Sequence, residues 1–288
     1  MQLLGQNPRA NRYFGAAVAV NGIFAVVGAP MGRELDIPLE RGEAHVFVRS
    51  LSWQFHSRLE SQYTHAGDFF GASVAMATDR IMVGMPGALP LAPDDENRNR
   101  RGVTVFTREG SYWVQNERVV PNQHRPLEMF GASVAFDGSR VTVGAPYAPL
   151  FADAGAPGSS YVFTVQPDAS WSQLARLQSA NGQTNDAFGL SVTHAANWVA
   201  VGALLQDNPD ALSGAVHLFD LTQPVLTIRQ TAEGAWLEWN AAYADFTLES
   251  SATLAPDANW QPVEPPPLGT EHLIHPTDAN RFYRLAKP

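Results

Sequence analysis

The stretch "MFGASVAFDGSRVTVGAP", residues 129–146, decides the fold of this chain, because close copies of it occur three more times. Each copy combines a Phe-Gly pair, an alternating apolar run, a short turn, a second alternating run and a glycine near its end. Regular self-similarity of this kind is typical of repeat proteins. The other copies are "YFGAAVAVNGIFAVVGAP" at 13–30, "FFGASVAMATDRIMVGMP" at 69–86 and "AFGLSVTHAANWVAVGAL" at 187–204.

Each copy continues into further extended segments. A polar loop leads to a third run, which reads "GEAHVFV" at 42–48, "RGVTVFT" at 101–107, "GSSYVFT" at 158–164 and "SGAVHLF" at 213–219. In the first three units a fourth segment follows, at 52–61, 112–120 and 170–179. The period is mainly two, with many β-branched and aromatic residues, which indicates strands. The pairs Asn21-Gly22 and Asp137-Gly138 favour tight hairpins. We therefore expect an all-β chain whose four-stranded antiparallel units form a β-propeller of four blades.

The recurring residues have structural explanations. The glycine after each phenylalanine allows close backbone approach, and the phenylalanines are expected to fill the space between neighbouring blades. Ser133 stands in a Gly-Ala-Ser context that could suggest a nucleophile, but serine recurs at that position in Ser73 and Ser191, which favours architecture over catalysis. We therefore predict no catalytic residue. The structural repeat positions are Phe14, Gly15, Phe70, Gly71, Phe130, Gly131, Phe188 and Gly189.

These units resemble FG-GAP repeats, the blades of integrin-alpha-like β-propellers, in the bacterial variety with a "W…L" outer strand. The resemblance covers residues 1–223 and implies a protein-binding or adhesion function at the cell surface or outside the cell. Many FG-GAP blades carry an Asp-rich calcium loop between the first two strands. Here that position holds only "NG", "TD", "DG" or "AAN", too short to supply six to eight oxygen ligands. No metal or cofactor is expected.

The last unit stops after its third segment, near Pro224, and the start of the chain is similar to the end of an outer strand. Residues 1–5 are therefore expected to complete the last blade and close a ring. The alternative is that these four blades belong to a larger propeller. The predicted blade units lie near 14–61, 70–120, 130–179 and 188–221.

The repeat is absent after residue 223. Residues 224–288 alternate in "AWLEWNA" and "DFTLESS" and end with "RFYRLAK", which favours a small β-sandwich. This segment resembles fibronectin-III-like C-terminal modules of bacterial surface proteins. Its aromatic residues are expected to form the core; they are Trp236, Trp239, Trp260, Phe282 and Tyr283.

Composition narrows the function. The formal net charge of −9 argues against nucleic-acid binding, and no apolar run is long enough to insert into a membrane. The first fifteen residues lack the basic region and the long apolar core of a signal peptide, so none is expected there. The longest connections join second to third strands and leave one face, where we expect an unknown protein or glycan partner to bind. The predicted binding residues are Leu91, Arg98, Arg101, Tyr147 and Phe151. Two alternatives stay open: a hydrolase or lyase with a central pocket, and a structural spacer in a larger surface protein.

Overall fold

The computed structural model confirms that the chain is all-β. The chain divides into two compact units. The first contains residues 1–173 and 177–219, and the second contains residues 174–176 and 220–288. No described segment forms a helix of the length and apolarity needed to cross a membrane. The structure describes residues 2–5, 13–31, 41–65, 67–87, 102–122, 128–146, 158–166, 168–206, 213–222, 226–230, 234–239, 246–253, 258–264, 267, 271–274 and 281–286.

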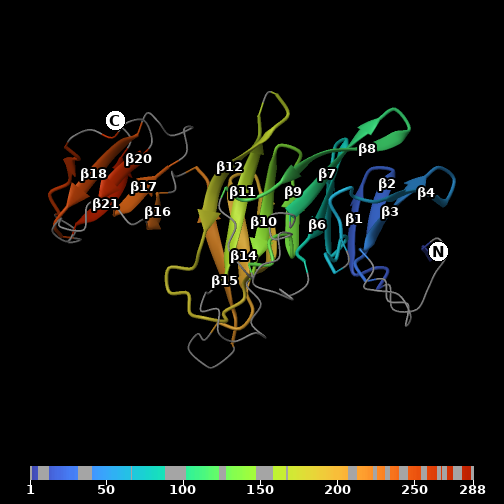
Figure 1. Cartoon of the computed structure of the whole chain (residues 1–288), viewed down its shortest axis with the longest axis horizontal. Coiled ribbons are helices and arrows are strands. Elements are labelled where there is room, and N and C mark those ends of the chain that lie inside the picture. The colour runs from blue at the N-terminus through green and yellow to red at the C-terminus, as the bar shows by residue number, and fades with distance from the viewer. Residues whose placement is uncertain are drawn as a thin grey trace. The chain divides into compact units, whose positions relative to one another are not determined.

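Four antiparallel sheets follow one another through the first unit, and we number them repeats 1 to 4 (Figure 1). Repeat 1 contains β1 (Ala17–Asn21), β2 (Phe24–Ala29), β3 (Glu43–Arg49) and β4 (Trp53–Leu59). Repeat 2 contains β5 (Ser73–Ala77), β6 (Arg80–Met85), β7 (Gly102–Glu109) and β8 (Tyr112–Val119). Repeat 3 contains β9 (Ser133–Phe136), β10 (Arg140–Ala145), β11 (Ser159–Val165) and β12 (Trp171–Leu177). Repeat 4 contains β13 (Phe188–Ala195), β14 (Trp198–Ala203) and β15 (Ala215–Asp220).

Neighbouring sheets pack face to face along the sequence. The first strands contact one another in the order β1, β5, β9 and β13. One apolar cluster joins repeats 1 and 2 and includes Val26 and Val46 from the first with Phe70 and Val83 from the second. A second cluster joins repeats 2 and 3 in the same way and includes Phe130. This arrangement of several four-stranded sheets is consistent with propeller blades.

A glycine allows close backbone approach at each of the three junctions, and a serine adds a hydrogen bond at the junctions of repeats 2 with 3 and 3 with 4. At the junction of repeats 3 and 4, a Cβ atom on Gly144 would lie 1.9 Å from the carbonyl oxygen of Gly189, so only glycine fits there. The hydroxyl of Ser133 donates a hydrogen bond to the same carbonyl at 2.8 Å. Ser73 makes the equivalent bond to Gly131 at 2.7 Å. The serine that resembles a nucleophile therefore links two repeats.

The prediction that residues 1–5 complete the last blade is wrong. In the described residues the sheet of repeat 4 has three strands, and residues 2–5 pair with none of them. Instead Leu3 packs against Ala25, Val27 and Phe47 of repeat 1. Leu3 precedes Phe14 by the same interval by which Leu59 precedes Phe70, and Leu59 likewise packs into the core of the repeat that follows it. The position of residues 2–5 is therefore determined by this apolar contact with repeat 1 and not by strand pairing with repeat 4.

The second unit consists of two three-stranded sheets. One has the order β16 (Thr227–Gln230), β17 (Ala235–Glu238) and β20 (Glu271–Ile274), and the other β19 (Gln261–Pro262), β18 (Thr247–Ser251) and β21 (Phe282–Ala286). Both sheets contribute to one core, which includes Leu237, Trp239 and Leu248, with Tyr283 packed against it. Phe282 is 40% exposed, so its prediction as a core residue is wrong. Neighbouring strand residues point to opposite faces, and Tyr283 takes the inward position.

Candidate functional site

The connections of the repeats differ sharply between the two ends of the sheets. Tight turns join first to second strands, at residues 22–23, 78–79, 137–139 and 196–197, and we call this end the turn rim. At the opposite end, the loop rim, the strands joined by the long connections of the first unit begin and end. These connections are residues 30–42, 86–101, 146–158 and 204–214 between second and third strands, and residues 60–72, 120–132 and 178–187 between repeats. The loop rim is thus the one end with enough chain to form a recognition surface.

The Phe-Gly turn builds the loop rim. Phe69 has φ 55° and Gly71 has φ 93°, so the chain reverses sharply around Phe70 before β5 begins. The amide of Phe70 donates to the carbonyl of Arg41 at 3.0 Å, which ties this turn to the connection of the preceding repeat. Tyr13, Met129 and Ala187 have the same left-handed conformation in the other repeats. The turn that begins repeat 2 therefore anchors the end of the long connection of repeat 1.

An acidic residue two positions before the phenylalanine braces the rim. The carboxylate of Asp68 accepts from the amide of His65 at 2.6 Å, while its carbonyl accepts from Gly87 at 3.0 Å. Asp186 repeats this arrangement with Gln183 at 2.7 Å and Leu205 at 3.1 Å. Each aspartate therefore joins two neighbouring loop bases. An acidic residue recurs two positions before the phenylalanine in repeats 2, 3 and 4, so the sequence could have indicated this role, but the sequence analysis did not predict it.

The third repeat uses its acid differently. Glu128 is buried and accepts a short hydrogen bond from the hydroxyl of Tyr161. The equivalent position on the third strand of repeat 4 is His217, whose Nε2 lies 2.6 Å from Gln206 Oε1. Polar residues thus connect the third strands to the loop rim from inside, which is compatible with burial because each has a partner.

The predicted binding residues lie outside the described residues. They are Leu91, Arg98, Arg101, Tyr147 and Phe151. Their connections are fixed at both ends by ladder pairs: Met85 pairs with Gly102, and Ala145 pairs with Ser159. Both connections therefore leave and re-enter the sheets at the loop rim.

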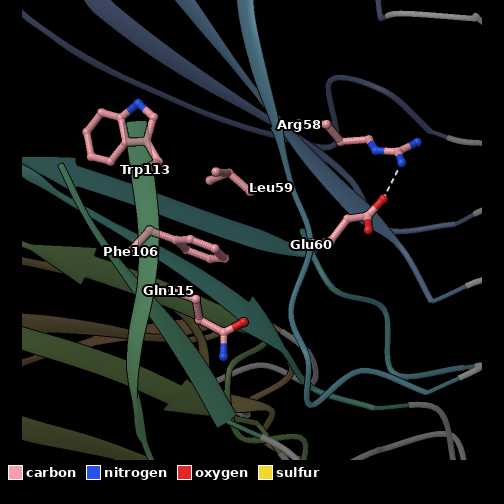
Figure 2. A pocket seen from close by; sticks show the side chains of 6 residues that line it. All are labelled: Arg58, Leu59, Glu60, Phe106, Trp113 and Gln115. Carbon is pink, nitrogen blue, oxygen red and sulfur yellow. Dashed lines mark ion pairs between the residues drawn. The ribbon is translucent and has the colours of Figure 1, made fainter. Parts of the chain in front are cut away.

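A groove of about 420 Å³ lies where the outer strand of repeat 1 meets repeat 2. Figure 2 shows Phe106, Trp113 and Gln115 on one side, with Leu59 and the ion pair between Arg58 and Glu60 on the other. The Gln115 side-chain oxygen accepts from the amide of Gln62 at 3.0 Å. Gln173 accepts from Asn122 at 3.0 Å in the same way at the next junction. The glutamine contact is thus a repeated feature of the junctions.

A hydroxyl, an imidazole and a carboxylate meet at the junction of repeats 3 and 4. Thr142 Oγ1 and His194 Nδ1 are hydrogen-bonded at 2.9 Å, and His194 Nε2 lies 3.6 Å from Asp137 Oδ2. This order of groups is that of an acyl-transfer triad. However, the exposed fraction of Thr142 is 0%, so its hydroxyl is closed to a substrate. The cluster links two repeats at a place where repeats 2 and 3 have Met82 and Phe136.

Burial controls the charge of this cluster. Desolvation lowers the pKa of His194 below its ordinary 6.5, the Asp137 carboxylate raises that pKa in part, and Arg140 lowers it further. For Asp137, burial raises the pKa, but hydrogen bonds from Arg140 and Ser139 outweigh burial and bring the pKa below 3.8. The cluster therefore contains a neutral imidazole beside a carboxylate near neutral pH. Arg140 also donates to Asn197 Oδ1 at 2.9 Å, which adds a second link between the repeats.

Metal ligands are not gathered in the described part of the chain. Among those residues no group of three or more histidine, aspartate or glutamate side chains could hold a metal ion.

Comparison with known families agrees with the repeat geometry. Residues 113–163 and 171–219 match the FG-GAP repeat family, so the prediction of FG-GAP repeats is confirmed there. Each match begins at the tryptophan of an outer strand and ends at a phenylalanine in the third strand of the next sheet. A family repeat thus spans two sheets. The chain is an all-β repeat protein that contains FG-GAP repeats.

Among solved structures, Sqt1 from Chaetomium thermophilum is similar to 74% of this chain, with 13% sequence identity and a TM-score of 0.43. The chain covers 45% of that protein, which is less than half of its length. No curated protein matches the chain in sequence. The resemblance of residues 224–288 to fibronectin-III-like modules stays a prediction.

Proposed function

We propose that this protein is a binding or adhesion module that presents its loop rim to a protein or glycan partner at the cell surface or outside the cell. The observation that carries the proposal is the segregation of every long connection to one rim, while the opposite rim has only short turns. A rigid scaffold with variable connections at one end is the arrangement in which binding loops are commonly found.

In this proposal the first unit is an FG-GAP propeller and the second is a fibronectin-III-like module. The two sheets with a shared core in the second unit support the latter part. The turns that replace calcium loops in related blades contain residues 22–23, 78–79, 137–139 and 196–197. Such short turns support binding that does not need calcium.

The aromatic and arginine side chains of the loop rim are the proposed contacts. Tyrosine and arginine are enriched among residues that dominate binding energy, so Arg98 and Tyr147 are the first choices for substitution. Leu91, Arg101 and Phe151 add apolar area and charge on the same two connections. A surface of this mixed character suits a protein or a glycan.

A loop exchange tests the proposal. Residues 88–101 or 147–157 are replaced by short Gly-Ser linkers, and binding to a glycan array and to immobilised surface proteins is measured with and without a calcium chelator. We expect each exchange to remove binding and the chelator to leave it unchanged. The control replaces the turn at 110–111, which joins β7 to β8 at the turn rim, with Asn-Gly and should leave binding unchanged. Binding that survives both loop exchanges would contradict the proposal.

An enzymatic function and a spacer function are the alternatives. The cluster of Asp137, Thr142 and His194 is the described feature nearest to catalytic chemistry, and its hydroxyl is buried. Turnover of model esters or polysaccharides that is lost in His194→Phe would favour the enzyme. If the protein is only a structural spacer, we expect no binding to the glycan array or to the immobilised surface proteins.

A further inference from the structure

The face that each repeat turns toward its successor is buried in repeats 1 to 3 and exposed in repeat 4. On the third strand of repeat 2, Val103 and Val105 are 0% and 2% exposed. At the same positions of repeat 4, Val216 and Leu218 are 70% and 67% exposed. Trp198 on β14 adds a half-exposed aromatic ring, at 53%. We call the surface of Ser191, Trp198, Gly202, Val216 and Leu218 the forward face of repeat 4.

The opposite face is exposed in repeat 1. Val74 and Met76 of repeat 2 are 8% and 9% exposed because repeat 1 covers them. The equivalent residues of repeat 1, Val18 and Val20, are 69% and 66% exposed. We call the surface of Gly15, Val18 and Val20 the rear face of repeat 1. One chain therefore displays both halves of the contact that it makes internally three times.

The serine and glycines that form the polar contact of each later junction also occur on the two exposed faces, the serine and one glycine on repeat 4 and the other glycine on repeat 1. Within the chain, Ser133 and Gly144 receive the carbonyl of Gly189 from the following repeat. In repeat 4 the equivalent residues are Ser191 and Gly202, and the three atoms nearest to a Cβ on Gly202 all belong to Ser191 of the same sheet. In repeat 1 the equivalent of Gly189 is Gly15, which has nothing within 4 Å of its Cβ position.

The incomplete sheet of repeat 4 has a matching segment at the start of the chain. In repeat 1 the outer strand pairs Leu59 with Ala44, and Leu59 also packs into repeat 2. Leu3 already makes the equivalent packing contact with repeat 1. Its strand partner by the same register would be Val216, on the open edge of β15. An exposed strand edge of this kind is a template for pairing with another chain.

We propose that a second copy of this chain docks head to tail, with the rear face of its repeat 1 on the forward face of repeat 4. Residues 2–5 of that copy then add the outer strand to repeat 4. Two such contacts close a pair with eight repeats, which lies within the range of blade numbers for propellers. The interface is a continuation of the junction between repeats, so it requires no new type of contact. It is independent of the binding proposed for the loop rim.

Light scattering after size-exclusion chromatography tests the proposal on the full chain at micromolar concentration. The protein is expected at about twice its mass of 31.3 kDa. Leu218→Arg and Val18→Glu each introduce an unpaired charge into the contact and should weaken dimerisation by about 30-fold or more. Leu51→Glu is the matched control, because Leu51 is fully exposed at the turn between β3 and β4 and belongs to neither face. A monomeric wild-type protein overturns the proposal, and a series of larger species overturns the closed pair.

Mixing the two charge variants separates head-to-tail docking from other dimers. In a mixed pair one contact is unmodified, and in the other the two introduced charges have opposite signs. Equimolar Leu218→Arg and Val18→Glu should therefore restore the dimer that neither forms alone. If only one of the two substitutions abolishes dimerisation, or if the mixture stays monomeric, the head-to-tail arrangement is overturned. Circular dichroism confirms that each variant is folded.

Discussion

The junction between repeats 3 and 4 and the forward face of repeat 4 present the same positions of the repeat to different surroundings. A Cβ on Gly144 would lie 1.9 Å from the backbone of the next repeat, whereas the three atoms nearest to a Cβ on Gly202 all belong to Ser191 of its own sheet. The comparison teaches that a repeat encodes half of an interface, and the neighbour determines how much that half stabilises the protein. Matched substitutions at equivalent positions should therefore differ in a predictable way, provided that the variants are compared as monomers.

The largest difference is expected for the glycines. Gly144→Ala forces a Cβ against the carbonyl of Gly189, so the junction must open, and we expect a loss of about 3 kcal/mol in the free energy of unfolding. Gly202→Ala should cost far less, because the exposed Ser191 side chain can rotate away. Urea denaturation of both variants at low protein concentration measures the difference. Equal losses at the two positions would contradict the comparison.

A smaller difference is expected for the apolar pair. Val105→Ala removes buried methyl groups between repeats 2 and 3 and should lower the unfolding free energy by about 2 kcal/mol. Leu218→Ala, at the equivalent exposed position, should stay within about 0.5 kcal/mol of the wild type. The same denaturation experiment applies. A destabilised Leu218→Ala monomer would show that the forward face is covered within its own chain.

The serines should differ by about 1 kcal/mol, the net value of an ordinary hydrogen bond. Ser133→Ala loses the bond to the Gly189 carbonyl, while Ser191→Ala loses no contact of this kind. Ala17 stands at this position in repeat 1, so alanine fits the backbone there. Thermal unfolding monitored by calorimetry should show a lower midpoint for Ser133→Ala only. An equal shift in Ser191→Ala would remove the distinction between junction and free face.

The smallest difference at neutral pH concerns His194, and it grows on acidification. Because the folded-state pKa of His194 lies below its ordinary 6.5, the unfolded chain takes up the proton first. Stability should therefore fall as the pH decreases below about 6.5, whereas His194→Phe should lack this part of the loss. Phe136 at the equivalent position shows that the repeat accepts phenylalanine. Denaturation curves between pH 7.5 and 5 test this, with His56→Gln as control. Parallel pH profiles for wild type and His194→Phe would contradict it.

Local patterns predicted the strands and their hairpins. The alternation in "VTV" at 141–143 and the Asp137-Gly138 pair identified β9, β10 and their turn, because period and turn chemistry act over a few residues. The bracing role of Asp68 depends on two loop bases that are distant in sequence, so a pattern within one repeat shows the residue but not its partners.

Contacts between repeats account for what sequence reasoning missed. The Asp137 and His194 cluster joins residues from different repeats, and no local motif connects them. Leu3 was assigned to repeat 4 by its similarity to outer-strand ends, and it instead contacts repeat 1. The similarity was real, because outer-strand ends pack on the following repeat as well as pairing with their own sheet.

The central claim is that the exposed rear face of repeat 1 and the exposed forward face of repeat 4 are two halves of one junction. The chain has no cysteine, so engineered cysteines report on a single contact. Leu3→Cys and Val216→Cys variants are mixed and oxidised, and disulfides are analysed by non-reducing electrophoresis. Directly paired strand residues lie within disulfide reach. We predict a covalent dimer in the mixture and none in either variant alone. No dimer in the mixture, or an internal disulfide when one chain carries both cysteines, would contradict the account.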